Sequence, residues 1–466
     1  MYEKIQNVLS LIDNMVWGIP LIALLLFTGI FFTFRLRGIQ FTQLKNAIKF
    51  LNKKDADGEE GDVSGFGALC TALSATIGTG NIVGVATAIV AGGPGALFWM
   101  WIAALFGTAT KFSECMLAHK FREVSADGHI LGGPFYYIEK GMGEKWKWMA
   151  KLFAIFGIFV GVLGTGTFTQ INGISSAIND FFDPKNLWSV ELFGRSYSWT
   201  VIITGIVVTI VVGLVLIGGI KRISKVAEVI VPFMAILYVV SAFAVIICNI
   251  TKVPMAVVEI IKGAFGIRQV AGGAIGTMFV AMQKGVSRGI FSNEAGLGSA
   301  PIAAAAAKTN ETVVQGLISM LGTYIDTIVV CSLTGIIIVI TGAWDMGFDG
   351  VVVTMKAYEI GFPIPGQVSD FILMVCLIFF AFTTILGWEY YSEKCLEYLI
   401  HDNMKIVNGY KWLYIIAIFI GPYMTVSAVW KIADICNGLM AIPNIVALLA
   451  LSGVVVAEVK KYSLKK

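Results

Sequence analysis

The amino-acid sequence predicts an all-α membrane protein that crosses the bilayer about eleven times. The first observation is composition: 57% of the 466 residues are hydrophobic and 14% are charged, and the mean hydropathy is +0.81. A soluble domain of this size does not bury so much apolar surface. The second is that apolar runs of about 20 residues, the length of a transmembrane helix, recur along the chain. The third is that lysine and arginine collect in alternate loops between these runs.

The first apolar run, Met15–Phe34, is too long for the core of a signal peptide, and Arg35 and Arg37 follow it instead of a cleavage site. We therefore expect a retained transmembrane helix. The other expected spans are Gly65–Ala91, Ala96–Ala118, Trp148–Ile178, Thr200–Ile217, Val226–Ile250, a compound segment Val270–Ala307, Thr312–Ile340, Val368–Tyr398, Trp412–Ala428 and Ile432–Val456.

The basic loops set the expected orientation, because positively charged loops stay in the cytoplasm. With alternating spans, most of these loops fall on one side of the membrane, from Arg35 to the lysines at the C-terminus. We expect a multi-pass protein of the plasma membrane, with its N-terminus outside and its C-terminus in the cytoplasm. The basic patches thus reflect topology in a lipid bilayer and do not indicate nucleic-acid binding.

The spans divide into two equal sets once the first helix is set aside. Residues 1–60 would hold that helix and a cytoplasmic amphipathic helix at Phe41–Lys53, while 61–250 and 251–466 hold five spans each. A second surface helix is expected at Val253–Gly266. Because five is an odd number, the second set enters from the opposite face, which is the pattern of an inverted repeat. In such transporters the first helix of each repeat is discontinuous at mid-membrane, where substrate binds.

The first helix of the first repeat carries the clearest sign of an interruption. Gly78, Gly80 and Asn81 lie almost side by side within a charge-free run, and each glycine weakens a helix by roughly 1 kcal/mol relative to alanine. A broken helix is tolerated in lipid only where its backbone faces protein, water or a ligand. The stretch therefore predicts an unwound segment that presents N–H and C=O groups to a small polar solute. Close helix packing by small residues is the alternative interpretation.

Four further polar residues fall within expected spans: Gln170, Asp326, Thr383 and Thr384. A charged aspartate at mid-bilayer is unfavourable by roughly 2.5–3.5 kcal/mol, so Asp326 must be protonated, paired or facing water. The adjacent threonines, together with carbonyls of a broken helix, would form the all-oxygen environment that hard cations prefer. The alternative is that each threonine only bonds its own helix.

Several classes of function are disfavoured. No GxxxxGK[ST] sequence is present, which disfavours an ATP-driven pump, and three scattered histidines leave no obvious zinc site. No catalytic constellation is visible, so we do not expect an enzyme. Lys111 and Glu114, three residues apart, are expected to form a local surface pair. The functions that remain are transport driven by an ion gradient and passive permeation.

Two long motifs resemble a known family. Residues 92–107, GGPGALFWMWIAALFG, and residues 285–301, GVSRGIFSNEAGLGSAP, are typical of the alanine or glycine:cation symporters. The resemblance implies import of small neutral amino acids, mainly alanine or glycine, with a sodium ion, which is the one cofactor expected. It also implies the leucine-transporter fold of five-plus-five inverted repeats, preceded here by one extra helix.

The resemblance also implies roles for particular residues. The stretch Ala75–Asn81 is similar to the unwound first helix of that fold, so Thr79 and Gly80 would offer N–H groups to the substrate carboxylate, at a helix N-terminus. Asn81 would lie beside the carboxylate or a second ion, with Asp326 as a possible partner. The implied sodium ligands are the carbonyl groups of Ser74, Ile77 and Phe380 and the hydroxyl groups of Thr383 and Thr384.

Gln170 would reach the substrate. The first helix of the second repeat should also be broken, but its many glycines, from Gly272 to Gly298, do not indicate where the break lies. We expect Gly276, Thr277 and Met278 to form the pocket wall there, with exposed carbonyls that accept from the substrate ammonium. Two rival functions stay open. The first is a proton-coupled or uncoupled exchanger of the same fold, in which Asp326 titrates, and the second is a channel.

Overall fold

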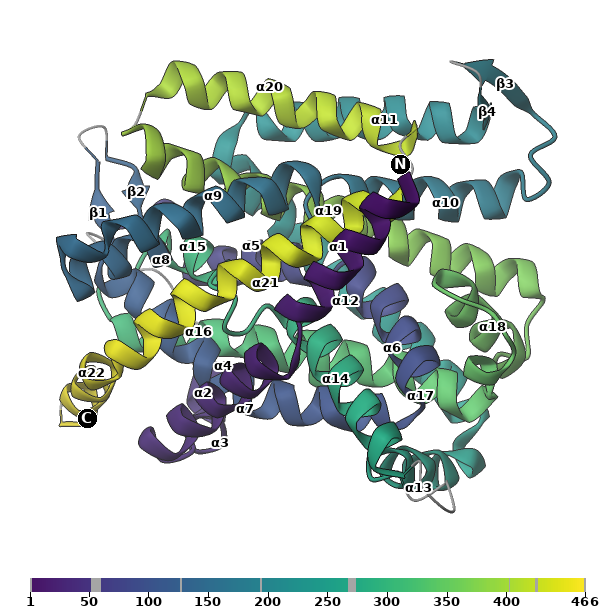
Figure 1. Ribbon diagram of the computed structural model, residues 1–466, viewed down its shortest axis with the longest axis horizontal. Coiled ribbons are helices and arrows are strands. Elements are labelled where there is room, and N and C mark those ends of the chain that lie inside the picture. The colour runs from purple at the N-terminus through teal and green to yellow at the C-terminus, as the bar shows by residue number, and fades with distance from the viewer. Residues whose placement is uncertain are drawn as a thin grey trace.

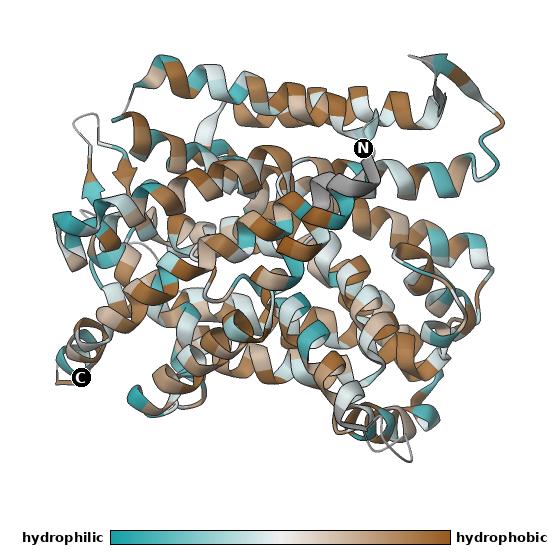
Figure 2. Ribbon diagram, in the orientation of Figure 1, coloured by the Kyte–Doolittle hydropathy of each residue, from teal (hydrophilic) through white to brown (hydrophobic). Residues whose placement is uncertain are grey.

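The computed structural model describes residues 2–51, 60–125, 128–192, 195–266, 274–401, 403–423 and 426–464, and it is a bundle of helices (Figure 1). Hydrophobic residues cover the long helices, and hydrophilic residues gather toward helix ends and loops (Figure 2). The described residues contain eight helices long and apolar enough to cross a membrane, or nine when a bent pair counts as one. The predicted all-α membrane fold is confirmed.

The elements of the first half are α1 (Tyr2–Val16), α2 (Ile19–Arg35), α3 (Ile39–Thr42), α4 (Leu44–Phe50), α5 (Gly65–Thr76), η1 (Gly80–Gly84), α6 (Val85–Gly92), α7 (Gly95–Lys120), β1 (Glu123–Val124), β2 (Ile130–Leu131), α8 (Pro134–Tyr136), η2 (Tyr137–Gly141), η3 (Glu144–Trp146), α9 (Lys147–Leu163), α10 (Phe168–Phe182), β3 (Ser189–Leu192), β4 (Arg195–Ser198), α11 (Trp199–Leu216) and α12 (Gly219–Cys248). The strands form two antiparallel hairpins, β1 with β2 and β3 with β4.

The elements of the second half are η4 (Ile250–Lys252), α13 (Val253–Ala264), α14 (Ala274–Asn293), α15 (Ala300–Ala305), α16 (Thr312–Thr323), η5 (Tyr324–Cys331), α17 (Ser332–Thr341), η6 (Ala343–Asp345), α18 (Val351–Gly361), α19 (Gly366–Ile400), α20 (Met404–Ile420), η7 (Gly421–Tyr423), α21 (Val426–Ala450) and α22 (Ser452–Leu464). The helix α20 packs beside α11 at one edge of the bundle, while α21 crosses the bundle diagonally with α1 against it (Figure 1).

Several predicted spans are divided in the structure, and two of them illustrate why the sequence does not show it. The expected span Trp148–Ile178 consists of α9 and α10, separated by non-helical residues at Gly164–Thr167. The expected span Ile432–Val456 ends as α21 at Ala450, and α22 starts at Ser452. In both cases hydropathy alone does not reveal the division, because the residues at the division are uncharged. The surface helix expected at Val253–Gly266 is confirmed as α13.

The two long sequence motifs meet in space. A Cβ added to Gly285 would lie 2.2 Å from the Ala96 carbonyl oxygen, and one added to Gly289 would lie 3.3 Å from the Met100 Cα atom. A Cβ on Gly107 would lie 3.0 Å from the Ala295 Cβ atom. Small residues thus bring α14 and α7 into backbone contact, as small residues do between membrane helices. The motifs form the interface between the first helix of the second repeat and α7.

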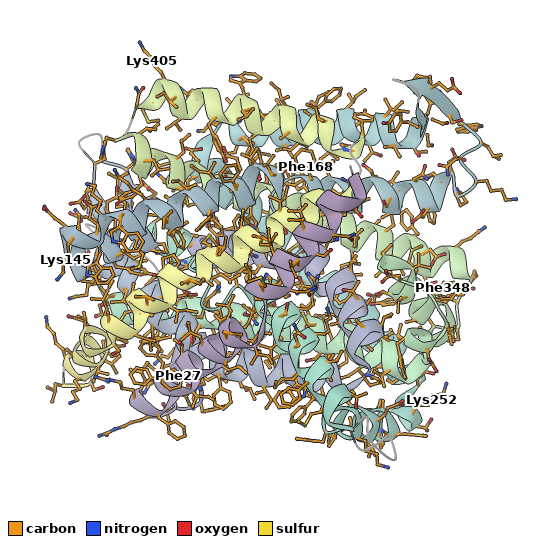
Figure 3. The ribbon with its side chains drawn as sticks, in the orientation of Figure 1. Phe27, Lys145, Phe168, Lys252, Phe348 and Lys405 are labelled. Carbon is orange, nitrogen blue, oxygen red and sulfur yellow. The ribbon has the colours of Figure 1, made fainter. Side chains whose placement is uncertain are left out.

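Residues from loops expected on different sides of the membrane lie toward different ends of the bundle. Lys145 and Lys405, both in loops predicted to be cytoplasmic, lie toward one end, and Lys252 and Phe348 lie toward the other (Figure 3). Which of these ends faces the cytoplasm stays a prediction from the charge pattern of the loops.

Candidate functional site

The predicted interruption of the first repeat is present and buried. Helix α5 ends at Thr76, and Ile77 is extended (φ −79°, ψ 93°) before a π-helical turn begins at Gly80. The segments on either side are bent by 53°. The Gly78 N–H donates to the Asn81 Oδ1 atom at 2.9 Å, so the amide side chain of Asn81 satisfies one backbone donor of the interruption. The backbone here bonds to side chains instead of continuing the helix, as predicted.

A cluster of oxygen atoms lies where α19 passes this interruption. The Thr384 hydroxyl lies 3.3 Å from the Ile77 carbonyl oxygen and 2.9 Å from the Phe380 carbonyl oxygen. The Thr383 hydroxyl lies 3.1 Å from that same Phe380 oxygen. All four residues are buried. The structure therefore brings together four of the five residues implied as sodium ligands.

Ser74, the fifth implied ligand, lies on α5 before the interruption. Its hydroxyl donates to the Thr71 carbonyl at 2.7 Å. A Cβ added to Gly387 would lie 2.8 Å from the Ser74 Oγ atom, and one added to Gly78 would lie 2.5 Å from the Thr384 Oγ1 atom. Glycines on both helices thus allow α5 and α19 to approach closely enough to bring the oxygen atoms together.

Gln170 reaches the interruption from the first turn of α10. Its Oε1 atom accepts from the Thr79 N–H at 3.3 Å, and its Nε2 atom donates to the Thr165 carbonyl at 3.0 Å. Thr165 belongs to the non-helical segment between α9 and α10, so the division of this span supplies the carbonyl that orients the glutamine. A Cβ on Gly173 would lie 2.7 Å from the Thr79 Cγ2 atom, which shows how closely α10 approaches.

Asp326 lies in the π-helical segment η5 and is paired with neutral donors. The Asn81 Nδ2 atom donates to its Oδ1 atom at 2.7 Å. The hydroxyl groups of Ser292 and Thr327 donate to its Oδ2 atom at 2.9 Å and 2.7 Å. The Thr334 hydroxyl donates to the Asn81 carbonyl at 2.8 Å. Sequence reasoning found Asp326 and Asn81 but missed the other three, because an isolated intramembrane hydroxyl carries no signal of its partner.

The interruption of the second repeat lies elsewhere than predicted. Helix α14 continues from Ala274 to Asn293 and therefore contains Gly276, Thr277 and Met278. Gly276 is exposed, and a Cβ added to it would meet nothing within 4 Å. The prediction that carbonyls of these residues are exposed at a break is wrong, because they lie inside a helix. The helix instead stops before Glu294, and α15 starts at Ala300.

Positive φ angles mark this second interruption. They occur at Glu294 (56°), Gly296 (87°) and Gly298 (84°), a region of backbone conformation that favours glycine. The glutamate is the exception, and its side chain is held by the Ser299 hydroxyl, which donates to its Oε2 atom at 2.6 Å.

Charged side chains from neighbouring helices fill the second interruption. The Glu114 Oε1 atom accepts from the Gly296 N–H at 3.4 Å, and its Oε2 atom accepts from the Asn444 Nδ2 atom at 2.9 Å. Asn444 also donates to the Gly296 carbonyl at 2.9 Å. The Lys111 ammonium donates to the Asn293 carbonyl at 2.9 Å. Lys111 and Glu114 are buried, so the expected surface pair is wrong, because their partners come from α14 and α21.

Comparisons with known proteins match the whole chain. A sequence model of the Sodium:alanine symporter family matches residues 2–466. The chain is 44% identical to the sodium/alanine symporter AgcS of Methanococcus maripaludis, over 98% of this chain and 97% of that protein. It is 38% identical to the probable sodium/glutamine symporter GlnT of Bacillus subtilis, over 100% of this chain and 92% of GlnT. An uncharacterized transporter of Haemophilus influenzae is 51% identical, over 98% and 96% of the two chains.

A solved structure shares the fold. The crystal structure of MhsT in complex with L-phenylalanine matches with a TM-score of 0.51 at 13% identity, over 84% of this chain and 99% of the MhsT chain. At this identity the match concerns the arrangement of helices, which is the leucine-transporter fold that the motifs imply.

Proposed function

Because the chain belongs to the sodium:alanine symporter family, we propose that it imports alanine or glycine across the plasma membrane together with sodium, by alternating access. Members of this family are transporters and not enzymes. The names of its relatives differ in their amino acid, alanine for AgcS and glutamine for GlnT, so the choice of a small amino acid is part of the proposal. Residues 61–250 and 251–466 would form the inverted repeats, with the C-terminus in the cytoplasm.

The observation that carries the proposal is the oxygen cluster at the first interruption. The Thr384 hydroxyl lies between the carbonyl oxygens of Ile77 and Phe380, within 3.3 Å of each. These neutral oxygen atoms, with the Thr383 hydroxyl and the Ser74 carbonyl, match the oxygen ligands that hard cations prefer. Sodium would replace hydrogen bonds that the cluster now makes internally. A sodium ion entering down 100 mV contributes roughly 2.3 kcal/mol, enough for a concentration ratio of roughly fiftyfold for a neutral solute.

We place the substrate carboxylate at Thr79 and Gly80, where the helix restarts and its backbone N–H groups favour an anion. The Thr79 N–H now donates to Gln170 Oε1, an oxygen atom of an amide. We propose that the carboxylate takes over this donor and that Gln170 turns its own N–H groups toward the substrate. Asn81, which donates to Asp326 and accepts from the Gly78 N–H, would hold the N–H groups in position.

The test is uptake of labelled alanine into proteoliposomes that contain the purified protein. We expect accumulation only with an inward sodium gradient, and none when choline replaces sodium. Uptake that survives choline replacement and follows a pH gradient would favour the exchanger in which Asp326 titrates. Flux that does not saturate and shows no counterflow would favour a channel.

A further inference from the structure

Glu389 is a buried carboxyl group that the proposed transport site does not use. It lies on α19, and its side chain has no exposed surface. Neither of its carboxylate oxygen atoms has a hydrogen-bond partner among the described residues. The residue follows Thr384 by five positions, which places it about 7.5 Å further along the helix axis and about 140° around it. Glu389 therefore lies near the oxygen cluster but on another face of α19.

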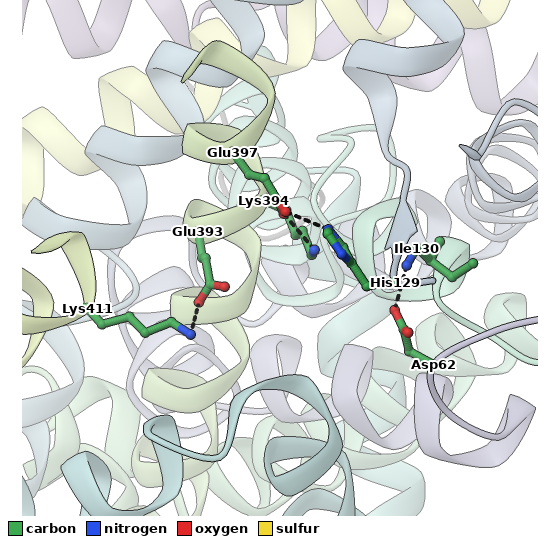
Figure 4. A network of polar contacts seen from close by, with 7 residues as sticks. All are labelled: Asp62, His129, Ile130, Glu393, Lys394, Glu397 and Lys411. Carbon is green, nitrogen blue, oxygen red and sulfur yellow. Dashed lines mark hydrogen bonds and ion pairs between the residues drawn. The ribbon is translucent and has the colours of Figure 1, made fainter. Parts of the chain in front are cut away.

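The cations that face Glu389 are occupied by other carboxylates. Lys411 of α20 pairs with Glu393 at 3.2 Å, and Lys394 pairs with Glu397 at 2.6 Å (Figure 4). His129 also binds Glu397, at 2.7 Å. The charged groups that act on Glu389 are Glu393, Lys411 and Lys394. Glu393 is one helical turn from Glu389. Lys411 therefore lies near both carboxyl groups, but it is already bonded to Glu393.

The remaining titratable neighbours are tyrosines of α20, and they leave Glu389 unsatisfied. Tyr414 donates its hydroxyl to the carbonyl groups of Gly166 and Ile385, at 2.9 Å each. The Tyr410 hydroxyl lies near Glu389 and beside the Ser392 side chain, and among the described residues it makes no hydrogen bond to Glu389. An ionised carboxylate in this environment would have neither a paired cation nor a hydrogen-bond donor, which is the most costly state for a buried acid.

We propose that Glu389 is a proton-binding site, separate from the sodium cluster, which holds its carboxyl group in the neutral form next to the contact between Glu393 and Lys411. The proton converts a carboxylate without partners into a neutral carboxylic acid, which needs no paired cation in the interior. Both sites lie on the rigid helix α19, so loss of the proton places a negative charge close to the sodium ligands. The consequence for transport rests on the proposed function, but the existence of the site does not.

The direct test is infrared spectroscopy of the full-length protein in lipid, comparing the wild type with Glu389→Gln. We expect the carbonyl stretch of a protonated carboxylic acid in the wild type, shifted in heavy water and lost in the variant. The matched control is Glu359→Gln, which removes an exposed carboxylate paired with Lys356 and should leave that band unchanged. Coincident spectra of the wild type and Glu389→Gln in this region would overturn the proposal.

A second variant keeps the test decisive if Glu389→Gln does not fold. Glu389→Met replaces the acid with an apolar side chain of similar length. We expect it to keep the thermal unfolding midpoint of the wild type in acidic buffer, because it replaces a neutral group. In alkaline buffer the wild type should unfold at a lower temperature than in acidic buffer, because the unfolded state gives up the Glu389 proton more readily than the folded state does. The unfolding midpoint of the Met variant should not show this change with pH. A wild-type midpoint that rises with pH, or a Met variant with the same pH dependence as the wild type, would contradict a neutral Glu389.

Discussion

The two interrupted helices differ in what satisfies their backbone groups. At the first, the Gly78 and Thr79 N–H groups donate to neutral amide oxygens of Asn81 and Gln170. At the second, the Gly296 backbone is bound by Glu114 and Asn444. The two side chains that bind the second interruption also bond each other, because the Asn444 Nδ2 atom donates to the Glu114 carboxyl group at 2.9 Å. The first interruption can therefore exchange its partners for a ligand, while the second is held as part of the protein.

The largest expected effect is at the second interruption. Lys111 is the cation that acts on three buried carboxyl groups, those of Glu114, Glu294 and Asp326. Lys111→Met removes it and should destabilise the protein by about 3–5 kcal/mol, because removing one partner leaves buried charge uncompensated. Unfolding in detergent measures this.

The matched control is Lys120→Met at the end of the same helix. Lys120 pairs with Glu458 at 2.7 Å where both side chains are partly exposed, so its loss should cost at most about 1 kcal/mol. Equal stability of the two variants would mean that charge does not hold the second interruption.

Gly78→Ala should give the next largest effect. The added Cβ would lie 2.5 Å from the Thr384 Oγ1 atom, so α19 must move away from the first interruption. We expect the sodium concentration for half-maximal alanine uptake to rise at least about tenfold, or 1.4 kcal/mol. Gly84→Ala is the control, because its Cβ meets nothing within 4 Å on the same segment. If both variants keep wild-type sodium dependence, the oxygen cluster is not the ion site.

Thr384→Ala tests the hydroxyl itself without adding bulk. One ligand is lost from the proposed sodium site, and we expect the sodium half-saturation to rise by about threefold to tenfold, in line with about 1 kcal/mol for one polar interaction. Thr384→Ser should restore most of the affinity. Thr383→Ala should have a smaller effect, because the Thr383 hydroxyl contacts only carbonyls of its own helix and a sulfur atom. A Ser variant as weak as the Ala variant would point to packing by the methyl group instead.

Sequence reasoning located the first interruption but did not fix the position of the second, for a physical reason. At the first, the glycines that break the helix stand alone in an apolar run. The second helix has many glycines with different tasks: Gly285 and Gly289 allow contact with α7, whereas Gly296 and Gly298 adopt positive φ. The sequence does not distinguish these two kinds of glycine, because the difference between them is in their backbone angles. Lys111 and Glu114 were misjudged similarly, because their spacing describes one helix and their partners come from others.

The smallest expected effect is at Gly276, which the sequence predicts in the pocket wall of the second interrupted helix. A Cβ on Gly276 meets nothing within 4 Å, and the residue lies inside α14. Gly276→Ala should leave alanine uptake unchanged and should stabilise the protein by at most about 1 kcal/mol through helix propensity. Gly285→Ala on the same helix is the contrast, because its Cβ would lie 2.2 Å from the Ala96 carbonyl oxygen and must separate α14 from α7. A loss of uptake in Gly276→Ala at normal stability would indicate that Gly276 lines the substrate pocket. The two interrupted helices would then be more alike in function than their contacts indicate.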